Sequence, residues 1–123
     1  MIDAEEVRSL IEKALGSPDE LKTLSAADPA LVTTLPRWVS RFGILAGTDG
    51  LWLWCEPRAD VQVGFPSQFV LDLPAGRYQV DTMDVTSRGW ISRESAQGGP
   101  LVGGLPFTCH PVLVWVHDAD RVR

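Results

Sequence analysis

Tryptophan is the residue type in this sequence with the clearest capacity for ligand binding. An exposed indole ring can stack on the apolar face of a sugar, and its N–H can donate a hydrogen bond to a hydroxyl. Trp52 and Trp54 are two residues apart, so in a strand they point to the same face and could form a flat platform. Trp90 or Trp38 could lie beside that pair. The candidate ligand-binding residues are therefore Trp52, Trp54 and Trp90, and the alternative is that these rings fill a core between a sheet and helices.

The histidine and cysteine residues do not have the spacing of a metal site. Cys109 and His110 are neighbours, so on a strand they point to opposite faces, and His110 and His117 also differ in strand parity. Asp118 and Asp120 could join His117, with an exposed acidic tail as the alternative. The sequence contains no nucleophile elbow and no phosphate-binding glycine loop. We therefore predict no metal and no cofactor, and the motifs give an enzyme no support.

Charge and hydropathy narrow the classes of partner. The 123 residues include 11 basic and 16 acidic ones, and the net charge of -5 would repel a phosphate backbone, so nucleic acid is not expected as a partner. The longest apolar runs, such as residues 112–116, are far shorter than the roughly twenty residues that span a bilayer. The N-terminus lacks the basic start and apolar block of a secretory signal. We expect a cytoplasmic, acidic, soluble protein without membrane contact.

Three helix starts occur before residue 37. Asp3 and Glu6 form a capping box, and apolar residues at three-and-four spacing follow as far as Gly16, which predicts a helix over residues 4–15. Residues 17–20 repeat the signal with Ser, Pro, Asp and Glu, and predict a second helix. Asp28 opens a short third one, which Pro36 ends. We expect a single domain over residues 1–123, in which a helical segment (1–36) packs on a β-sandwich-like region (37–118).

After residue 37, β-branched and aromatic residues alternate with Gly and Pro, as is typical of short strands. The predicted strands lie at about 38–45, 51–56, 60–64, 68–73, 77–84, 90–94, 101–105 and 111–117, with a hairpin turn at 47–50 in which glycine takes a positive φ. Residues 51–54 and 112–116 are apolar on both faces, which predicts central strands covered from both sides. Asp81 alternates with Val80 and is expected on a solvent-facing side. Cys55 and Cys109 are expected to be a buried pair of reduced thiols.

The fold class predicted from these elements is mainly β (α+β): an antiparallel β-sandwich-like domain with two or three short N-terminal helices. Residues 72–81, Gly98-Gly99-Pro100-Leu101 and residues 111–116 carry a resemblance to a known group. The chain over about residues 39–118 resembles the C-terminal β-sandwich accessory domains of bacterial glycoside hydrolases and related surface proteins, in which a Leu-Pro-x-Gly-x-Tyr turn enters a central strand. The resemblance implies a non-catalytic β-sandwich associated with carbohydrate.

Together these observations predict a non-catalytic binding or interaction module, with carbohydrate as the associated ligand. The alternative is a cytoplasmic protein of the immunity or adaptor kind, which binds a protein partner or self-associates as a homo-oligomer through an exposed sheet edge or its helical face. An enzyme ranks third, because no catalytic constellation supports it.

Overall fold

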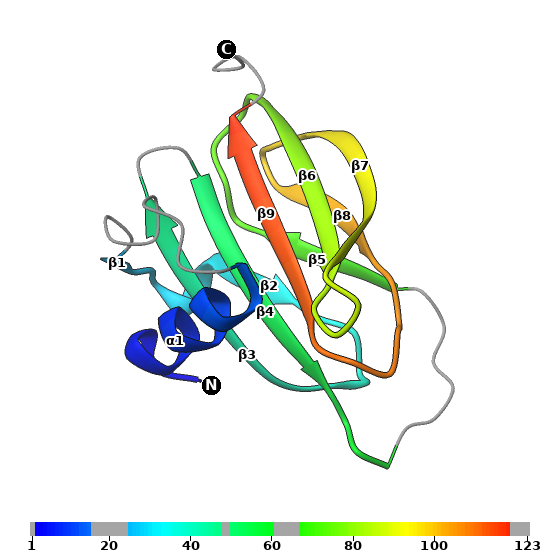
Figure 1. Cartoon of the computed structure of the whole chain (residues 1–123). Coiled ribbons are helices and arrows are strands. Elements are labelled where there is room, and N and C mark those ends of the chain that lie inside the picture. The colour runs from blue at the N-terminus through cyan, green and yellow to red at the C-terminus, as the bar shows by residue number, and fades with distance from the viewer. Residues whose placement is uncertain (1, 16–24, 48–49, 61–66, 119–123) are drawn as a thin grey trace.

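The computed structural model describes residues 2–15, 25–47, 50–60 and 67–118, and within them the chain is mainly antiparallel β-sheet, as predicted. A six-stranded sheet has the order β1 (Ser25–Ala26), β3 (Val39–Gly47), β4 (Gly50–Pro57), β9 (Val112–Asp118), β6 (Arg77–Asp84), β7 (Gly89–Gln97). A three-stranded sheet has the order β2 (Val32–Thr34), β5 (Ser67–Leu71), β8 (Leu101–Leu105). Helix α1 (Ala4–Leu15) lies across the face of the large sheet that points away from the small sheet (Figure 1). We call that face the outer face, and the opposite one the inner face.

The expected strands after residue 37 agree closely with the observed ones. The hairpin of β3 and β4 forms as predicted, and Gly50 has the positive φ (152°) expected of its turn. β4 and β9 pair with each other and are central in the large sheet. This confirms the prediction that segments apolar on both faces form central strands. The strand expected at 60–64 falls mostly outside the described residues.

The expectation of two or three N-terminal helices is only partly met. Helix α1 begins where the capping box predicts, since the N–H of Glu6 donates to Asp3 Oδ1 at 2.9 Å. The second expected helix lies in residues 16–24, outside the described part. The third is wrong: Pro29–Leu31 make a single 3-10 turn capped by Asp28, and the chain then enters β2. Backbone pairing of β2 with β5 outweighs the local helix signal, because a short helix gains little without an apolar face to bury.

The inner face packs on the small sheet to form the main core. Leu53 and Val114 of the large sheet and Phe69 and Leu71 of the small one are all fully buried. Burial of such a side chain contributes about 1.5–3 kcal/mol, so this layer supplies most of the driving force for the two sheets to associate.

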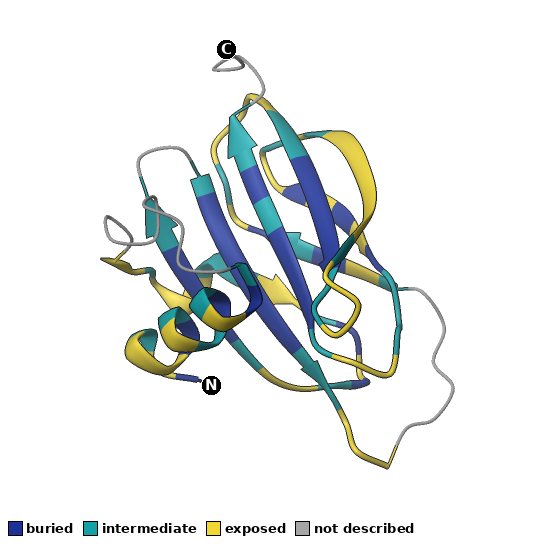
Figure 2. Ribbon diagram, in the orientation of Figure 1, coloured by how far each residue is buried: buried dark blue, intermediate teal, exposed yellow. Residues whose placement is uncertain are grey.

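A second apolar layer lies between α1 and the outer face. Val7 and Ile11 of the helix are fully buried against Leu45, Trp54 and other outer-face residues. Figure 2 shows the consequence: buried residues line the helix side that faces β3 and β4, while β7 is largely exposed. The apolar layer under the helix extends to Leu113 of β9 and Met83 of β6, and β7 remains largely exposed at the edge of the outer face.

The expected buried pair of cysteines is met for Cys55 only. Cys55 is fully buried, and desolvation raises the pKa of its thiol to about 12. Cys109 is exposed in the turn before β9, so the predicted buried pair is wrong.

Of the helices in the described residues, none is both long enough and apolar enough to cross a bilayer.

Candidate functional site

Two of the three predicted ligand-binding tryptophans are buried. Trp52 and Trp54 share the outer face, as their spacing predicts, but α1 covers that part of the sheet and leaves the residues 8% and 3% exposed. Their rings fill the layer between the sheet and the helix, which is the alternative to ligand binding for this pair.

Trp90 has the opposite environment. It is 51% exposed at the start of β7, the edge strand of the large sheet among the described strands. Its neighbour Ile91 is exposed as well, and a register shift between β6 and β7 falls at this point. Large apolar side chains exposed side by side are uncommon and tend to mark a binding surface. Trp90 is thus the predicted site residue that a ligand can reach.

A hollow of about 440 Å³ lies on the outer face beside Trp90. Its lining comes from β6, β7 and β9: Asp81, Trp90, Ile91, Ser92, Arg93 and Trp115. A volume of this order suits a small ligand or one unit of a larger one. The lining combines two tryptophans and one isoleucine with one aspartate, one arginine and one serine, which is a mixed apolar and polar set of residues.

Asp81 forms the polar centre of this surface. The side chain was expected to face solvent, yet it is only 4% exposed, because side chains from both neighbouring strands close over it. Arg93, its cross-strand partner on β7, donates from Nε to Oδ1 at 2.8 Å and from Nη2 to Oδ2 at 3.4 Å. His117 on β9 lies on the other side, with Nε2 3.0 Å from Oδ2. Since a carboxylate only accepts, this contact assigns the ring hydrogen to Nε2.

Arg93 contributes the exposed positive charge of the hollow. Its side chain is 69% exposed, although its inner edge is held by Asp81. The hydrogen bond and charge of Asp81 raise the pKa of Arg93 above its usual value, so the guanidinium is permanently charged. A charged group held in one orientation at the edge of an aromatic hollow is well suited to binding a polar ligand.

Trp115 forms the wall between this site and the helix-covered layer. Its ring stacks with Trp52 on β4, with centroids 5.2 Å apart and an interplanar angle of 11°. On its own strand it stacks with His117 at 3.9 Å and 23°. These contacts fix the orientation of the Trp115 ring, so Trp90 is the indole left with an open face for stacking.

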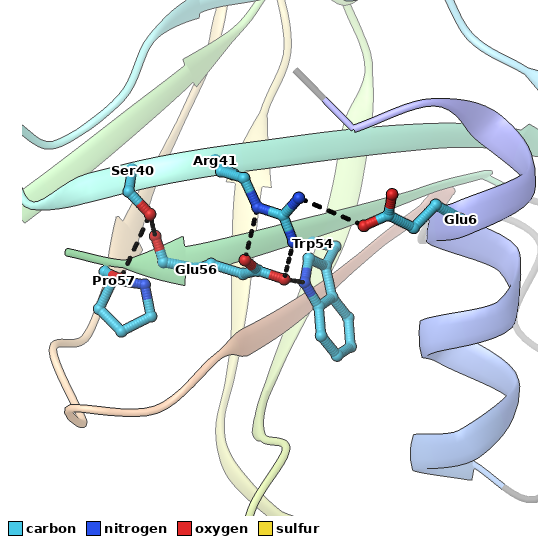
Figure 3. Close-up of polar contacts among 6 residues, drawn as sticks. All are labelled: Glu6, Ser40, Arg41, Trp54, Glu56 and Pro57. Carbon is cyan, nitrogen blue, oxygen red and sulfur yellow. Dashed lines mark hydrogen bonds and ion pairs between the residues drawn. The ribbon is translucent and has the colours of Figure 1, made fainter. Parts of the chain in front are cut away.

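A second cluster of the same kind lies at the other end of the outer face (Figure 3). Arg41 on β3 donates to its cross-strand partner Glu56 from Nε at 2.8 Å and Nη2 at 3.1 Å, and Trp54 Nε1 donates to Glu56 at 3.0 Å. Arg41 Nη1 then reaches Glu6 on α1 at 3.3 Å. This cluster ties the helix to the sheet.

The pKa values in this second cluster follow from the same contacts. Partial burial would raise the pKa of Glu56, but the hydrogen bonds from Arg41 and Trp54, together with the Arg41 charge, outweigh it and lower that pKa. The hydrogen bond and charge of Glu56 in turn raise the pKa of Arg41. Glu56 is therefore ionised over the whole neutral range.

The histidines do not come together. His117 belongs to the Asp81 cluster, whereas His110 lies in the turn before β9, 3.6 Å from Asp84. Among the described residues, no group of three or more His, Cys, Asp and Glu side chains could hold a metal ion. The lining of the hollow has one carboxylate, already hydrogen-bonded at both oxygens, whereas glycoside hydrolysis uses a pair.

No protein-family model matches this chain, and no curated protein matches its sequence at a significant level.

The residues around Asp81 form no recognisable motif in the sequence, because they come from three separate strands. The usable signal is local: Asp81 stands on a strand otherwise rich in core residues, and Trp115 and His117 share one face of a strand by parity. Nothing local shows that these two strands pair, or that Arg93 lies opposite Asp81.

Proposed function

We propose that this chain is a non-catalytic binding module whose site is the hollow between Trp90 and Trp115, and that its ligand is a carbohydrate. The observation that carries the proposal is the exposed Trp90 ring beside polar groups held in fixed orientation by the Asp81 cluster. A sugar ring stacked on Trp90 would place its hydroxyls near Arg93. This is the combination of apolar face and oriented hydrogen bonds that saccharide recognition needs.

Two further points support a binding role. The turn and strand motifs over about residues 39–118 resemble non-catalytic accessory domains of glycoside hydrolases, which agrees with a site that has an aromatic wall. Asp81 is engaged by Arg93 and His117, so it is a structural centre of the site more than a group available for proton transfer.

Calorimetric titration of the protein with a panel of neutral and acidic oligosaccharides tests this proposal. We expect saturable binding, and a loss of affinity of about tenfold or more in Trp90→Ala, since an aromatic stacking contact and its buried area together contribute about 1.4 kcal/mol or more. Val102→Ala is the matched control, because Val102 is a comparably exposed apolar residue that does not line the hollow. Equal affinities in the two variants, or no binding across the panel, would refute a sugar site here.

A second candidate function rests on the exposed edge strand. β7 is nine residues long, and its exposed Trp90 and Ile91 could meet a protein partner or a second copy of the chain. The charged residues Arg93 and Glu94 in the middle of β7 disfavour strand addition, which is why we rank this function second. Light scattering after size-exclusion chromatography distinguishes them: a dimer that Ile91→Lys dissociates would favour the second function.

A further inference from the structure

We infer that the saccharide bound in the hollow carries a carboxylate, and that Arg93 is the residue that binds it. This inference rests on the proposed function and narrows its ligand to the acidic sugars. It comes from a comparison of the two arginine clusters on the outer face, one of which already contains a second carboxylate.

The two clusters share an arginine–carboxylate pair across neighbouring strands and a ring N–H that reaches the same carboxylate. In each, a carboxylate on one strand receives Nε and Nη2 of the cross-strand arginine, with Nε distances of 2.8 Å in both Arg41–Glu56 and Arg93–Asp81. In each, a ring N–H completes the carboxylate, from Trp54 at 3.0 Å in one and from a histidine at 3.0 Å in the other. The arginine–carboxylate pairing is thus alike in the two clusters, whereas the ring donor comes from the carboxylate's own strand in the first and from a neighbouring strand in the second.

The clusters differ at the outer edge of the guanidinium. Nη1 of Arg41 reaches a second carboxylate, that of Glu6, at 3.3 Å (Figure 3). Among the described residues, Arg93 contacts one carboxylate only, that of Asp81. A guanidinium has five N–H donors, and with two directed at Asp81 three remain, on a side chain that is 69% exposed. Within the described part of the chain, no second carboxylate has toward Arg93 the role that Glu6 has toward Arg41, and Arg93 lines the hollow.

The balance of donors and acceptors favours an anionic oxygen group in that position. Both Asp81 oxygens are already hydrogen-bonded, so the polar side chains of the lining offer mainly the donors of Arg93. A carboxylate only accepts, and it can take two parallel N–H bonds from the end of a guanidinium. With a carboxylate both partners are charged, and the fork of the guanidinium matches its two oxygens, which a single neutral hydroxyl cannot do. The fixed orientation of Arg93 reduces the entropy that the pairing costs.

Titration with matched ligands tests the inference. Oligogalacturonate and oligomannuronate are each compared as the free acid and as the methyl ester, which keeps the rings and removes the charge. We expect the better-binding acid to bind about tenfold more tightly than its ester, because a charged hydrogen-bonded pair exceeds a neutral one by roughly this factor.

Variants of Arg93 assign the effect to this residue. Arg93→Gln should abolish the discrimination, so that acid and ester bind this variant with affinities within about twofold of each other, and Arg93→Lys, which keeps the charge but not the fork, should show an intermediate difference. Arg88→Gln is the control, since Arg88 is an exposed arginine outside the lining. Thermal unfolding of each variant verifies that it is folded.

The outcomes separate this inference from the function on which it rests. Equal binding of acid and ester, with both lost in Trp90→Ala, overturns the carboxylate and leaves the sugar site standing. Discrimination between acid and ester that persists in Arg93→Gln overturns the role of Arg93. Absence of binding by these saccharides and by the neutral panel overturns the proposed function and this inference together.

Discussion

Gly43→Ala should displace α1 from the outer face. Gly43 is in β3 beneath the helix, and a Cβ there would overlap Cγ2 of Val7 and lie 3.3 Å from the Cβ atoms of Val7 and Ile2. Val7 is fully buried and β-branched, so it has little freedom to rotate within a helix. The helix must therefore move outward or the core must strain.

The size of the effect follows from these contacts. Overpacking of a buried site costs about 1–3 kcal/mol, so we expect Gly43→Ala to lower the free energy of unfolding by about 2 kcal/mol. Val7→Ala alone removes two methyl-sized groups at about 0.8 kcal/mol each, plus a cavity contribution, for a total of about 2 kcal/mol. In the double variant the new methyl takes part of the vacated space, so we expect a loss of about 2 kcal/mol instead of about 4.

Urea unfolding followed by tryptophan fluorescence measures all three variants, because Trp52 and Trp54 lie under the helix and report its position. Gly89→Ala is the control: it is also a strand glycine, but a Cβ there meets only Ser87 Oγ at an ordinary 3.5 Å. If Gly43→Ala were as stable as Gly89→Ala, or if the two single losses added in the double variant, close packing of α1 on Gly43 would be refuted.

Three further predictions concern the polar contacts and the thiols. The lowered pKa of Glu56 gives stability that is present above the ordinary glutamate pKa of about 4.3 and is lost as pH falls through the lower folded value. Glu56→Gln should therefore flatten the fall in urea stability from pH 5 to pH 3, whereas Glu5→Gln on the exposed side of α1 should leave its slope unchanged. A thiol-reactive chromogenic disulfide should modify the exposed Cys109 in the native protein. It should modify the buried Cys55, whose pKa is about 12, only after denaturation. Modification of two thiols in the native protein would contradict the burial of Cys55. Tyr78→Phe removes the 3.0 Å hydrogen bond to a turn carbonyl and should cost about 1 kcal/mol in urea unfolding, and an unchanged midpoint would show that water replaces the bond.

Much of the fold could be read from local patterns. The capping box at Asp3 and the 3.6-residue period that follows it identify α1 to the residue, since both act within a few positions of the chain. The two-sided apolar sequences of β4 and β9 identify central strands for the same reason. The segment at Asp28 shows the limit: its helix signal is real but short, and pairing with β5 directs the chain into β2.

The binding site required information that no local pattern carries. Trp52, Trp54 and Trp90 look alike as residue types, and only the placement of α1 buries the first two and leaves the third open. Likewise, Asp81 and Arg93 are twelve residues apart, and their pairing depends on which residues of β6 and β7 stand opposite each other.

Residue types and spacing thus determine which segments become helix or strand and which face of each is apolar, because those preferences are properties of neighbouring residues. Strand order and register are set by the packing of the whole chain, since one residue of slip moves every side chain to the other face. In this protein that packing brings the ring of His117 and the guanidinium of Arg93 to the same carboxylate, and so creates the candidate site.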